Sequence, residues 1–471
     1  MNELKELAKF GLYSPEQEHD SCGVGVVANI KGGKSHQIVS EGIQVLINLG
    51  HRGACGRDSE TGDGSGVMIQ MPDSFFQIEC ASLGMPLPPA NDYGVGMVFL
   101  PPQEDAQVKC QALIERVIVD EGLILLGWRD VPTDPRKLGR DARAVCPKIR
   151  QVFIGRGPGI EDPAEIERKL YVVRKIIEHS LADCGITEDE ADYFYICSMS
   201  CNTIVYKGLL MAHQMIGFYP DLADETLVSA FGLVHSRFST NTLGHWKLAH
   251  PYRYLAHNGE INTIQGNRNW ALARENKFEN ELLPNLSDLS PLVNREGSDS
   301  SSMDNMLELL ICGGMDLFRA IRMVVPPAWQ NVETMDADLR AFYEYNSMHM
   351  EAWDGPAGIV LTEGRYAVCL LDRNGLRPAR YVITKNGYIT LASEIGVWDY
   401  QPEDVVSKGR VGPGQILAVD TQTGEVLHTD DVANRLKSRH PYRKWLKENA
   451  LRIQATLDDR DHGSDFLSSE R

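Results

Sequence analysis

The sequence predicts an α+β fold in which mainly antiparallel sheets are covered by helices. Short apolar runs bounded by Gly, Pro or Asp occur in groups with few helices between them, unlike the regular alternation of a parallel α/β fold. The run 381–392 contains a central Asn-Gly dipeptide, which is a strong signal for a two-residue hairpin. Helical periodicity is concentrated at 164–179 and in a helix-rich insert after residue 259.

Individual elements follow from the same patterns. Strands are expected at residues 24–30, 66–71, 94–100, 123–128, 151–154, 227–240, 253–259, 357–362 and 366–372, with hairpins at 192–211 and 381–392. Helices are expected at residues 164–179, 266–275, 298–310 and 335–353. The aromatic residues of the last helix recur at spacings of three and four, so we expect them in the core rather than around a ligand.

Composition and charge exclude several classes of protein. Of the 471 residues 43% are hydrophobic and 24% charged, as in soluble globular proteins, and no uncharged apolar run approaches the roughly 20 residues of a membrane span. The net charge of −18 repels phosphate backbones and anionic membrane surfaces, so neither nucleic acid nor a membrane is an expected partner. The ten cysteines form no C-x-x-C pair, which indicates reduced thiols, a cytoplasmic location and no metal site.

Cys22 stands at the head of the apolar run in residues 20–30, D-S-C-G-V-G-V-V-A-N-I. If the chain is cut before Cys22, one residue carries both a thiol and an α-amine with a pKa of roughly 7.7 to 8.0, which supplies a nucleophile with its own base. The alternative is an ordinary buried strand cysteine. The preceding residues 1–21 carry acids and lack the continuous apolar stretch of a secretory signal, so a processed leader is possible and export is not indicated.

Three later stretches suit a cysteine nucleophile that acts on an amino-acid amide. Arg237, in H-S-R-F-S-T-N-T, could hold a carboxylate, or could form a surface salt bridge. The Asn258 amide and the Gly259 N–H, in A-H-N-G-E-I-N, could form an oxyanion hole, or a hairpin turn. Asp299, in R-E-G-S-D-S-S-S-M-D-N, could bind an ammonium group, or cap a helix.

Seven motifs in one order carry a resemblance to a known family. They are C-G-V-G, H-R-G, G-D-G-S-G, S-R-F-S-T-N-T, H-N-G-E-I-N, E-G-S-D-S-S-S and L-D-R-N-G-L-R-P. From about residue 10 to about residue 445 the chain resembles class II glutamine amidotransferases with an N-terminal nucleophile, and in particular the amidotransferase domain of the glutamate synthase large subunit. The resemblance implies the four-layer αββα fold of N-terminal nucleophile hydrolases, with two stacked, mainly antiparallel sheets between helices.

The resemblance also implies a role for each candidate residue. Cys22 matches the nucleophile that cleavage exposes, and Asn258 and Gly259 match the oxyanion pair. Arg237 matches the arginine that holds the α-carboxylate of glutamine, and Asp299 matches the acid that holds its α-ammonium group. No metal ion is implied.

The resemblance further divides the chain. Residues 1–21 would be a propeptide, residues 22–430 the amidotransferase domain, and residues 431–471 a linker or the start of a central domain. Residues 51–66 resemble a loop that closes over bound glutamine, and their glycines would permit such motion.

The implied reaction is hydrolysis of L-glutamine to glutamate and ammonia through a Cys22 thioester. The ammonia would pass to a synthase domain or subunit that aminates 2-oxoglutarate. No cofactor is expected in this chain, and FMN and an iron–sulfur cluster are expected only in the synthase part. The electron donor of the whole enzyme, a nicotinamide nucleotide or ferredoxin, stays open.

Other functions are compatible with parts of the sequence. A metal-dependent hydrolase could use His235, His245, His250 and His257, although their spacing matches no helical H-x-x-x-H site. The chain could also be a non-catalytic glutamine-binding or scaffolding module, or a stand-alone amidotransferase that serves another acceptor.

Overall fold

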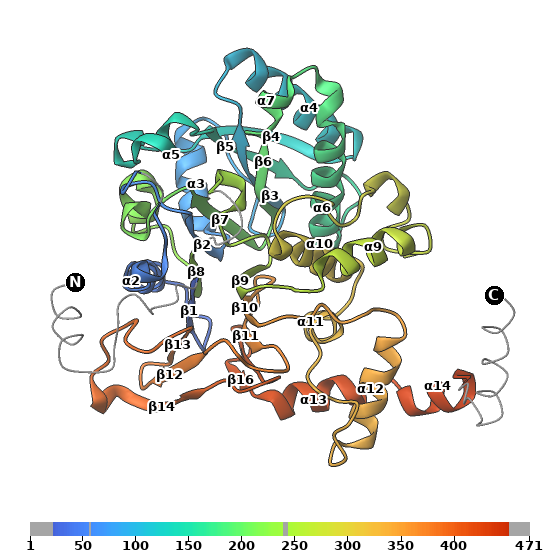
Figure 1. Cartoon of the computed structure of the whole chain (residues 1–471). Helices are drawn as coiled ribbons and strands as arrows, with labels where there is room; N and C mark the ends of the chain where they lie inside the picture. Colours follow the sequence, from blue (N-terminus) through green and yellow to red (C-terminus); the bar gives the residue numbers. More distant parts are fainter. Residues whose placement is uncertain (1–21, 56–57, 239–243, 452–471) are drawn as a thin grey trace, which may run out of the picture.

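The computed structural model describes residues 22–55, 58–238 and 244–451. The predicted propeptide, residues 1–21, lies outside the described residues, as do the last twenty residues of the predicted linker. The described residues form three sheets with helices packed around them, and every pair of neighbouring strands is antiparallel (Figure 1). The predicted α+β class is therefore confirmed.

The largest sheet contains the strand that begins directly after Cys22. Its order is β14-β12-β13-β1-β8-β2-β7. The bounds are β1 (Gly23–Asn29), β2 (Ser65–Gln70), β7 (Thr203–Gly208), β8 (Phe231–Ser236), β12 (Arg380–Thr384), β13 (Tyr388–Ala392) and β14 (Val405–Arg410). Because β1 is a central strand that pairs with β13 on one side and β8 on the other, the position of its first residues is fixed.

The second sheet carries the Asn-Gly pair and packs against the first. Its order is β16-β15-β11-β10-β9. The bounds are β9 (Leu255–Gly259), β10 (Ala357–Leu361), β11 (Tyr366–Leu371), β15 (Ile416–Asp420) and β16 (Glu425–Leu427). Strands β1 and β8 of the first sheet contact β9 of the second, so the two sheets meet at the strands that carry the candidate residues.

Helices surround the sheets. Their bounds are α2 (His36–Asn48), α3 (Asp73–Ser82), α4 (Glu104–Asp120), α5 (Arg140–Ala144), α6 (Pro163–Ser180), α7 (Glu188–Ala191), α8 (Met215–Phe218), α9 (Ile264–Glu275), α10 (Asp299–Cys312), α11 (Leu317–Val324), α12 (Ala337–Ser347), α13 (Thr429–Ser438) and α14 (Tyr442–Asn449). No helix among them is long and apolar enough to span a membrane.

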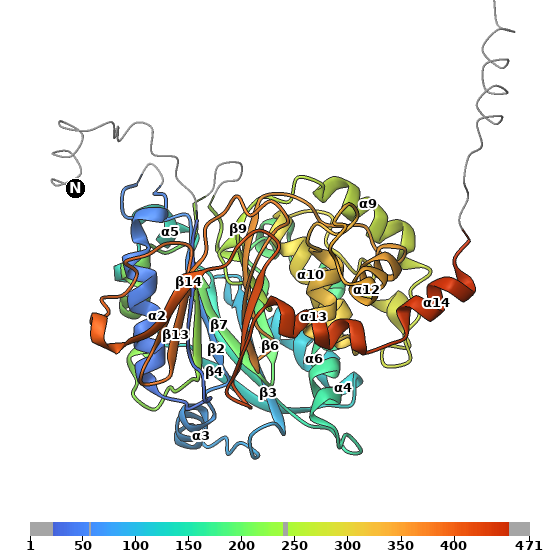
Figure 2. The same ribbon diagram turned by 90° about the horizontal axis from the view of Figure 1, so that it is seen from below.

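The alternation of side chains along the strands produces the layers. In β10, Val360 joins the core that the first sheet shares with α2, whereas Ile359 and Leu361 join the core formed with α10 to α13. Helix α2 lies along one side of the molecule and α10 to α13 along the other, with the two sheets between them (Figure 2). The predicted four-layer αββα arrangement is confirmed.

A third sheet was not expected. Its order is β4-β5-β3-β6, with bounds β3 (Tyr93–Leu100), β4 (Ile124–Asp130), β5 (Lys148–Gly155) and β6 (Tyr195–Ser200). Helices α4 and α6 share an apolar core with this sheet.

The predicted hairpin at 192–211 is wrong, because β6 and β7 belong to different sheets. Strand β6 pairs with β3, and β7 pairs with β2. The hydroxyls of Ser198 and Ser200 accept the backbone N–H groups of Val205 and Thr203, at 3.2 Å each, so serine side chains replace ladder bonds at this crossing.

Two elements are shorter than expected. Helix α12 begins at residue 337 rather than 335 because the Asp336 side chain caps it, accepting the N–H groups of Asp338 and Leu339 at 3.0 Å each. Strand β8 covers residues 231–236 of the expected 227–240. The predicted Asn386-Gly387 hairpin is confirmed by the pairing of β12 with β13 and by a φ of +81° at Gly387.

Candidate active site

Cys22 lies immediately before β1, where this central strand of the first sheet begins. The pairing of β1 with β8 places Gly23 opposite Ser236. The next residues beyond that pair are Cys22 and Arg237. The Cys22 thiol donates to the Phe238 carbonyl oxygen, and the Phe238 N–H donates to Cys22 Sγ, both at 3.3 Å. The thiol is therefore anchored to the end of β8, and Cys22 is only partly buried.

The surroundings of Cys22 act on its pKa in opposite directions. Burial raises the pKa of the thiol, whereas the Phe238 N–H and the guanidinium groups of Arg237 and Arg377 lower it. Burial is the larger effect, so the thiol stays protonated to a higher pH than an ordinary cysteine. A base close to Sγ is consequently needed before this thiol can act as a nucleophile.

Arg237 is buried where β8 ends, with 6% of its surface exposed. Its N–H donates to the Gly64 carbonyl oxygen at 2.9 Å, and its Nη1 donates to the Asp63 carbonyl oxygen at 3.3 Å. A surface salt bridge, the alternative for this residue, would require an exposed side chain. Arg237 is instead a buried cation, and the pairing of Gly23 with Ser236 places it next to Cys22.

Asn258 and Gly259 end β9, the edge strand of the second sheet. They are ladder residues opposite Gly358 and Ala357, so the hairpin-turn alternative is wrong. Asn258 is 2% exposed, and its Oδ1 has no hydrogen-bond partner among the described residues. Gly259 has a φ of +143°, and a Cβ there would lie 1.8 Å from the Pro356 carbonyl oxygen. Only glycine fits this position.

Asp299 is the first residue of α10 and connects that helix to the segment after β9. Its Oδ2 accepts the Ile261 N–H at 2.7 Å, and its Oδ1 accepts the Ser300 N–H at 2.7 Å. The N-cap of α10 is Ser298, whose hydroxyl accepts the Ser301 N–H, so the capping role considered for Asp299 belongs to its neighbour. A carboxylate with two oxygens retains further acceptor capacity after these bonds.

Three histidines connect β8 to β9 close to these residues. His235 Nε2 is 3.1 Å from the His257 carbonyl oxygen, the His257 N–H donates to His250 Nδ1 at 3.4 Å, and the rings of His235 and His250 stack at 4.2 Å. His257 Nδ1 lies 2.8 Å from the Ser300 hydroxyl. Burial lowers the pKa of all three, so they are neutral at pH 7.

The fourth histidine of the metal-site alternative lies elsewhere. His245 Nε2 contacts Asp192 at 2.9 Å, and no group of three or more His, Cys, Asp or Glu residues in the described ranges could hold a metal ion. His235, His250 and His257 are used in packing β8 against β9.

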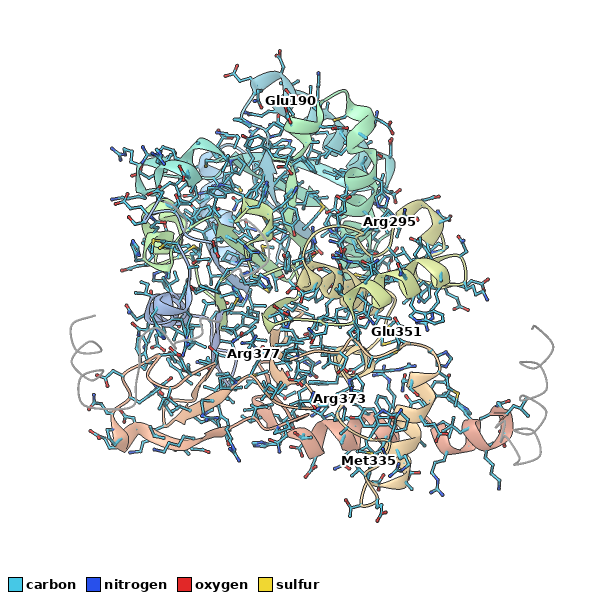
Figure 3. The ribbon with its side chains drawn as sticks, viewed as in Figure 1. Glu190, Arg295, Met335, Glu351, Arg373 and Arg377 are labelled. Carbon is cyan, nitrogen blue, oxygen red and sulfur yellow. The ribbon has the colours of Figure 1, made fainter. Side chains whose placement is uncertain are left out.

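Sequence reasoning assigned no role to Arg377. This residue follows β11, in the motif L-D-R-N-G-L-R-P (Figure 3). Its guanidinium lowers the pKa of Cys22. In the sequence, this motif indicates only resemblance to the family. Nothing in the sequence shows that the segment after β11 faces the start of β1, because that proximity arises from the stacking of the two sheets.

The predicted closing loop, residues 51–66, is described except for residues 56–57. Arg52 pairs with Glu394 at 2.7 Å, and Asp63 and Gly64 accept the hydrogen bonds from Arg237. The loop thus contacts the candidate carboxylate site directly. Its closure over glutamine stays a prediction.

Comparison with known proteins identifies the family. The model of the family described as glutamine amidotransferases class-II matches residues 22–445. The chain belongs to the class II glutamine amidotransferases. The match begins at Cys22, the residue expected to become the N-terminus of the mature amidotransferase.

Several relatives resemble this amidotransferase over nearly its whole length. It is 45% identical over 464 residues to the "Glutamate synthase [NADPH] large chain" of Bacillus subtilis, covering 98% of this chain and 30% of the relative. It is 41% identical to the "Ferredoxin-dependent glutamate synthase, chloroplastic" of Oryza sativa, covering 93% and 27%, and 40% identical to the "Glutamate synthase [NADH]" of Schizosaccharomyces pombe, covering 95% and 21%. The chain thus spans less than a third of these relatives.

Proposed function

We propose that this chain hydrolyses L-glutamine to glutamate and ammonia, with Cys22 as the nucleophile. The observation that carries the proposal is the chain of contacts that joins Cys22 to the end of β8 and joins β8 to β9. The thiol bonds to Phe238 after β8, His235 of β8 bonds to His257 of β9, and β9 then ends in Asn258 and Gly259. Family membership from residue 22 onward supports the same assignment.

In the proposed first step, the Cys22 thiolate attacks the γ-carboxamide carbon of glutamine. The α-amine of Cys22 takes the thiol proton and later gives it to the leaving nitrogen, so that ammonia departs as the C–N bond breaks. A γ-glutamyl thioester remains. Water adds to the thioester, the C–S bond breaks, and glutamate and the free thiol are restored.

The developing oxyanion would be held by the Asn258 side-chain amide and the backbone N–H of Gly259. Removal of one such donor costs about 100- to 1,000-fold in kcat in comparable sites. The φ of Gly259 and the contact that excludes a Cβ fix this backbone, so the donor is in place before the substrate arrives.

The two ends of the glutamine zwitterion would be bound by Arg237 and Asp299. Arg237 is a buried cation beside the nucleophile, suited to the α-carboxylate, and Asp299 offers remaining acceptor capacity to the α-ammonium group. A buried charge without its counterpart is costly, so this pair would discriminate glutamine from simple amides.

The mechanism requires cleavage between Ser21 and Cys22, which would make residues 1–21 a propeptide. Burial raises the pKa of Cys22, and the three nearby histidines are neutral and held in packing contacts. The α-amine released by cleavage is the base that the proposal assigns. We also propose that residues 22–430 form the catalytic domain and that residues 431–471 are a linker or the start of a central domain.

We further propose that the ammonia serves a glutamate synthase reaction, in which a synthase domain or subunit aminates 2-oxoglutarate. The similarity of 40–45% to three glutamate synthases supports this acceptor. FMN and an iron–sulfur cluster would belong to that synthase part. Relatives named for NADPH, NADH and ferredoxin have nearly equal identity, so similarity does not select the electron donor. The free state of all ten cysteines fits the cytoplasmic location that we propose.

The experiment that tests the proposal combines intact mass with a glutaminase assay on the 471-residue chain. We expect a mass that lacks residues 1–21 and release of ammonia from L-glutamine that disappears in Cys22→Ala. If the processed chain binds glutamine but releases no ammonia, the non-catalytic binding module is the better account. Ammonia release from the unprocessed chain at the same rate would contradict the role of the α-amine.

A further inference from the structure

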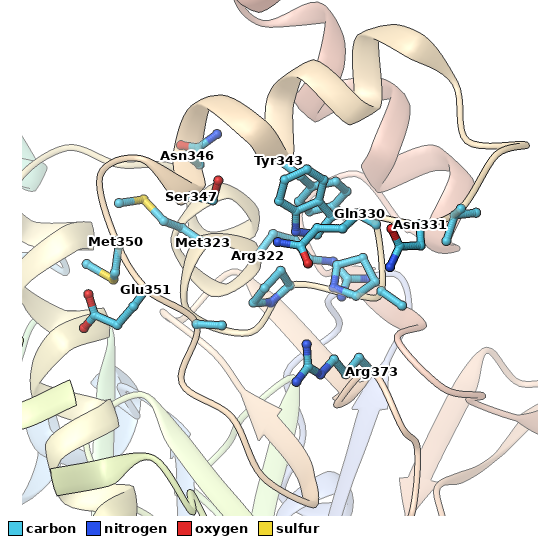
Figure 4. Close-up of a pocket in the computed structure, with 16 residues that line it drawn as sticks. Arg322, Met323, Gln330, Asn331, Tyr343, Asn346, Ser347, Met350, Glu351 and Arg373 are labelled. Atoms are coloured by element: carbon cyan, nitrogen blue, oxygen red, sulfur yellow. The ribbon is translucent and has the colours of Figure 1, made fainter. Parts of the chain in front are cut away.

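A pocket lies among α11, α12 and the segments that follow them, and Cys22 is not among the residues that line it. Its volume is about 630 Å³, within the range of sites for small organic molecules. Its walls come from Arg322 and Met323 of α11, from the loop 326–332, from Tyr343, Asn346 and Ser347 of α12, from residues 350–352, and from Arg373 (Figure 4).

The pocket contains a buried cation without a counter-charge. Arg322 is 2% exposed, and its Nη2 donates to the Gly414 carbonyl oxygen at 2.9 Å. Its Nη1 is buried and has no hydrogen-bond partner among the described residues, and no carboxylate in the described ranges forms an ion pair with it. A guanidinium stays charged in proteins, so a buried positive charge lines this cavity.

This arrangement differs from that of other buried arginines in the chain. Arg129 pairs with Asp221 at 2.8 Å, Arg253 pairs with Glu178 at 3.0 Å, and Arg174 pairs with Glu308. Since a buried ion without its partner is costly, an arginine that bonds only to a carbonyl leaves a charge that an incoming anion can neutralise.

Of the two arginines that line the pocket, Arg373 is paired with a carboxylate and Arg322 is not. Arg373 pairs with Asp354, and the one acidic side chain lining the pocket, Glu351, pairs with Arg274. Arg322 therefore supplies an uncompensated positive charge, in a molecule whose net charge is −18.

Aromatic rings form one wall. The rings of Trp329 and Tyr343 stack with centroids 6.4 Å apart and planes 21° apart. Figure 4 shows Tyr343 beside Gln330, with Arg322 nearby. Sequence analysis expected the aromatics of this helix only in the core; Phe342 fulfils that expectation, whereas Tyr343 also lines the cavity. A flat apolar body would stack against this wall.

The rim of the pocket is held in place before any ligand enters. Arg340 donates to the carbonyl oxygens of Trp329, Gln330 and Val332, and Pro326 and Pro327 restrict the backbone that leads into this loop. Such a preformed site loses little entropy when it binds.

We propose that this pocket binds a small organic anion that joins a carboxylate or phosphate group to a flat, apolar body. The Arg322 guanidinium would hold the anionic group, and the flat body would lie against Trp329 and Tyr343. The proposal does not depend on the glutaminase reaction, because it uses none of the residues assigned to that site.

Titration calorimetry with four probes tests the proposal on the 471-residue chain. The probes are benzoate, phenyl phosphate, acetate and inorganic phosphate. We expect at least one aromatic anion to bind roughly tenfold more tightly than the small anion with the same charged group, because only the aromatic probe also covers the ring wall. Benzoate alone would identify a carboxylate ligand, and phenyl phosphate alone a phosphate ligand. Binding of none of the four probes, or equal binding of the aromatic and small anions, would overturn the proposal.

Variants locate the binding and separate it from the active site. Arg322→Gln is expected to weaken binding of the aromatic anion roughly tenfold or more, because a charged hydrogen bond is lost. Arg443→Gln, which removes an exposed arginine paired with Asp338 at 3.5 Å, is the matched control and should bind normally. Trp329→Leu should erase the preference for aromatic probes even if Arg322→Gln does not fold.

Arg237→Gln should leave this binding unchanged. If Arg237→Gln abolishes the binding and Arg322→Gln does not, the anion occupies the glutamine site and the proposal fails. That result would leave the proposed glutaminase reaction intact.

Discussion

Cys22 and Cys197 both belong to apolar, strand-forming runs, and the structure gives them different surroundings. Cys197 lies inside β6 with none of its surface exposed, and burial raises the pKa of its thiol to about 12. Cys22 lies before the first residue of β1, partly exposed, with Sγ bonded to Phe238. Each thiol has two cations nearby, Lys207 and Arg253 for Cys197, so nearby positive charge does not distinguish them.

The comparison teaches that the end of a strand, rather than residue type, makes a cysteine a candidate nucleophile. A thiol inside a strand, like that of Cys197, is enclosed by the packed face of the sheet. A thiol at the strand end can meet substrate, and the other strands that end there can supply partners. The predictions below follow from this difference.

The largest effect is expected from a matched pair of substitutions. Cys22→Ser should lower kcat for glutamine hydrolysis by about 1,000-fold or more, because the thiolate is lost and a hydroxyl is a far poorer nucleophile. Cys197→Ser should retain kcat within a few-fold. Steady-state ammonia release from both variants makes the measurement, and equal losses would remove the distinction between the two cysteines.

Asn258→Ala is expected to lower kcat about 100- to 1,000-fold with a smaller change in KM, because an oxyanion donor acts mainly in the transition state. The control is Asn267→Ala, which removes a buried amide that donates to the Ala352 carbonyl oxygen at 3.2 Å. A KM effect without loss of kcat would show that Asn258 binds the ground state instead.

Arg237→Gln is expected to raise KM for glutamine roughly 10- to 100-fold, since a charged hydrogen bond contributes about 1.5–3 kcal/mol. Arg150→Gln, which removes the pairing with Asp130 at 2.6 Å, serves as its control and should leave KM nearly unchanged. Initial rates over a range of glutamine concentrations provide both constants. An unchanged KM in Arg237→Gln would exclude its role in holding the α-carboxylate.

The smallest effect concerns pH. Burial raises the pKa of the Cys22 thiol. Its alkylation rate should therefore rise with pH and reach half its maximum at a pH above roughly 8.5, the pKa of an ordinary cysteine. Arg377→Gln should move this midpoint higher, because the lost guanidinium favoured the thiolate. Arg373→Gln, in the same motif, should not move it. Iodoacetamide labelling of Cys22, followed by peptide mass, gives the profile, and a downward shift in Arg377→Gln would contradict the electrostatic assignment.

Much of the fold could be predicted because it rests on local patterns. A short apolar run predicted β10, and Asn386-Gly387 predicted the β12–β13 hairpin. The crossing of β6 into a third sheet was missed, because it depends on which distant strand competes for each edge. The serine hydroxyls that replace ladder bonds there have no distinctive sequence pattern.

The candidate site was found through motif order rather than through any single residue. Arg237, Asn258 and Asp299 each had an ordinary alternative, and their contacts are set by the stacking of the sheets and by α10. Arg377 was missed for the same reason. The Arg322 pocket is built mainly from residues 322–352, but the burial of Arg322 and its missing counter-charge become visible only in three dimensions.

One measurement addresses the central claim most directly, namely that Cys22 becomes an N-terminal nucleophile for glutamine. The chain is treated with a thiol-reactive analogue of glutamine, and the labelled residue and the mature N-terminus are identified by peptide mass spectrometry. The account predicts one label, on Cys22, in molecules that begin at Cys22, with protection by L-glutamine. Labelling of another cysteine such as Cys197, or equal labelling of molecules that retain residues 1–21, would contradict it.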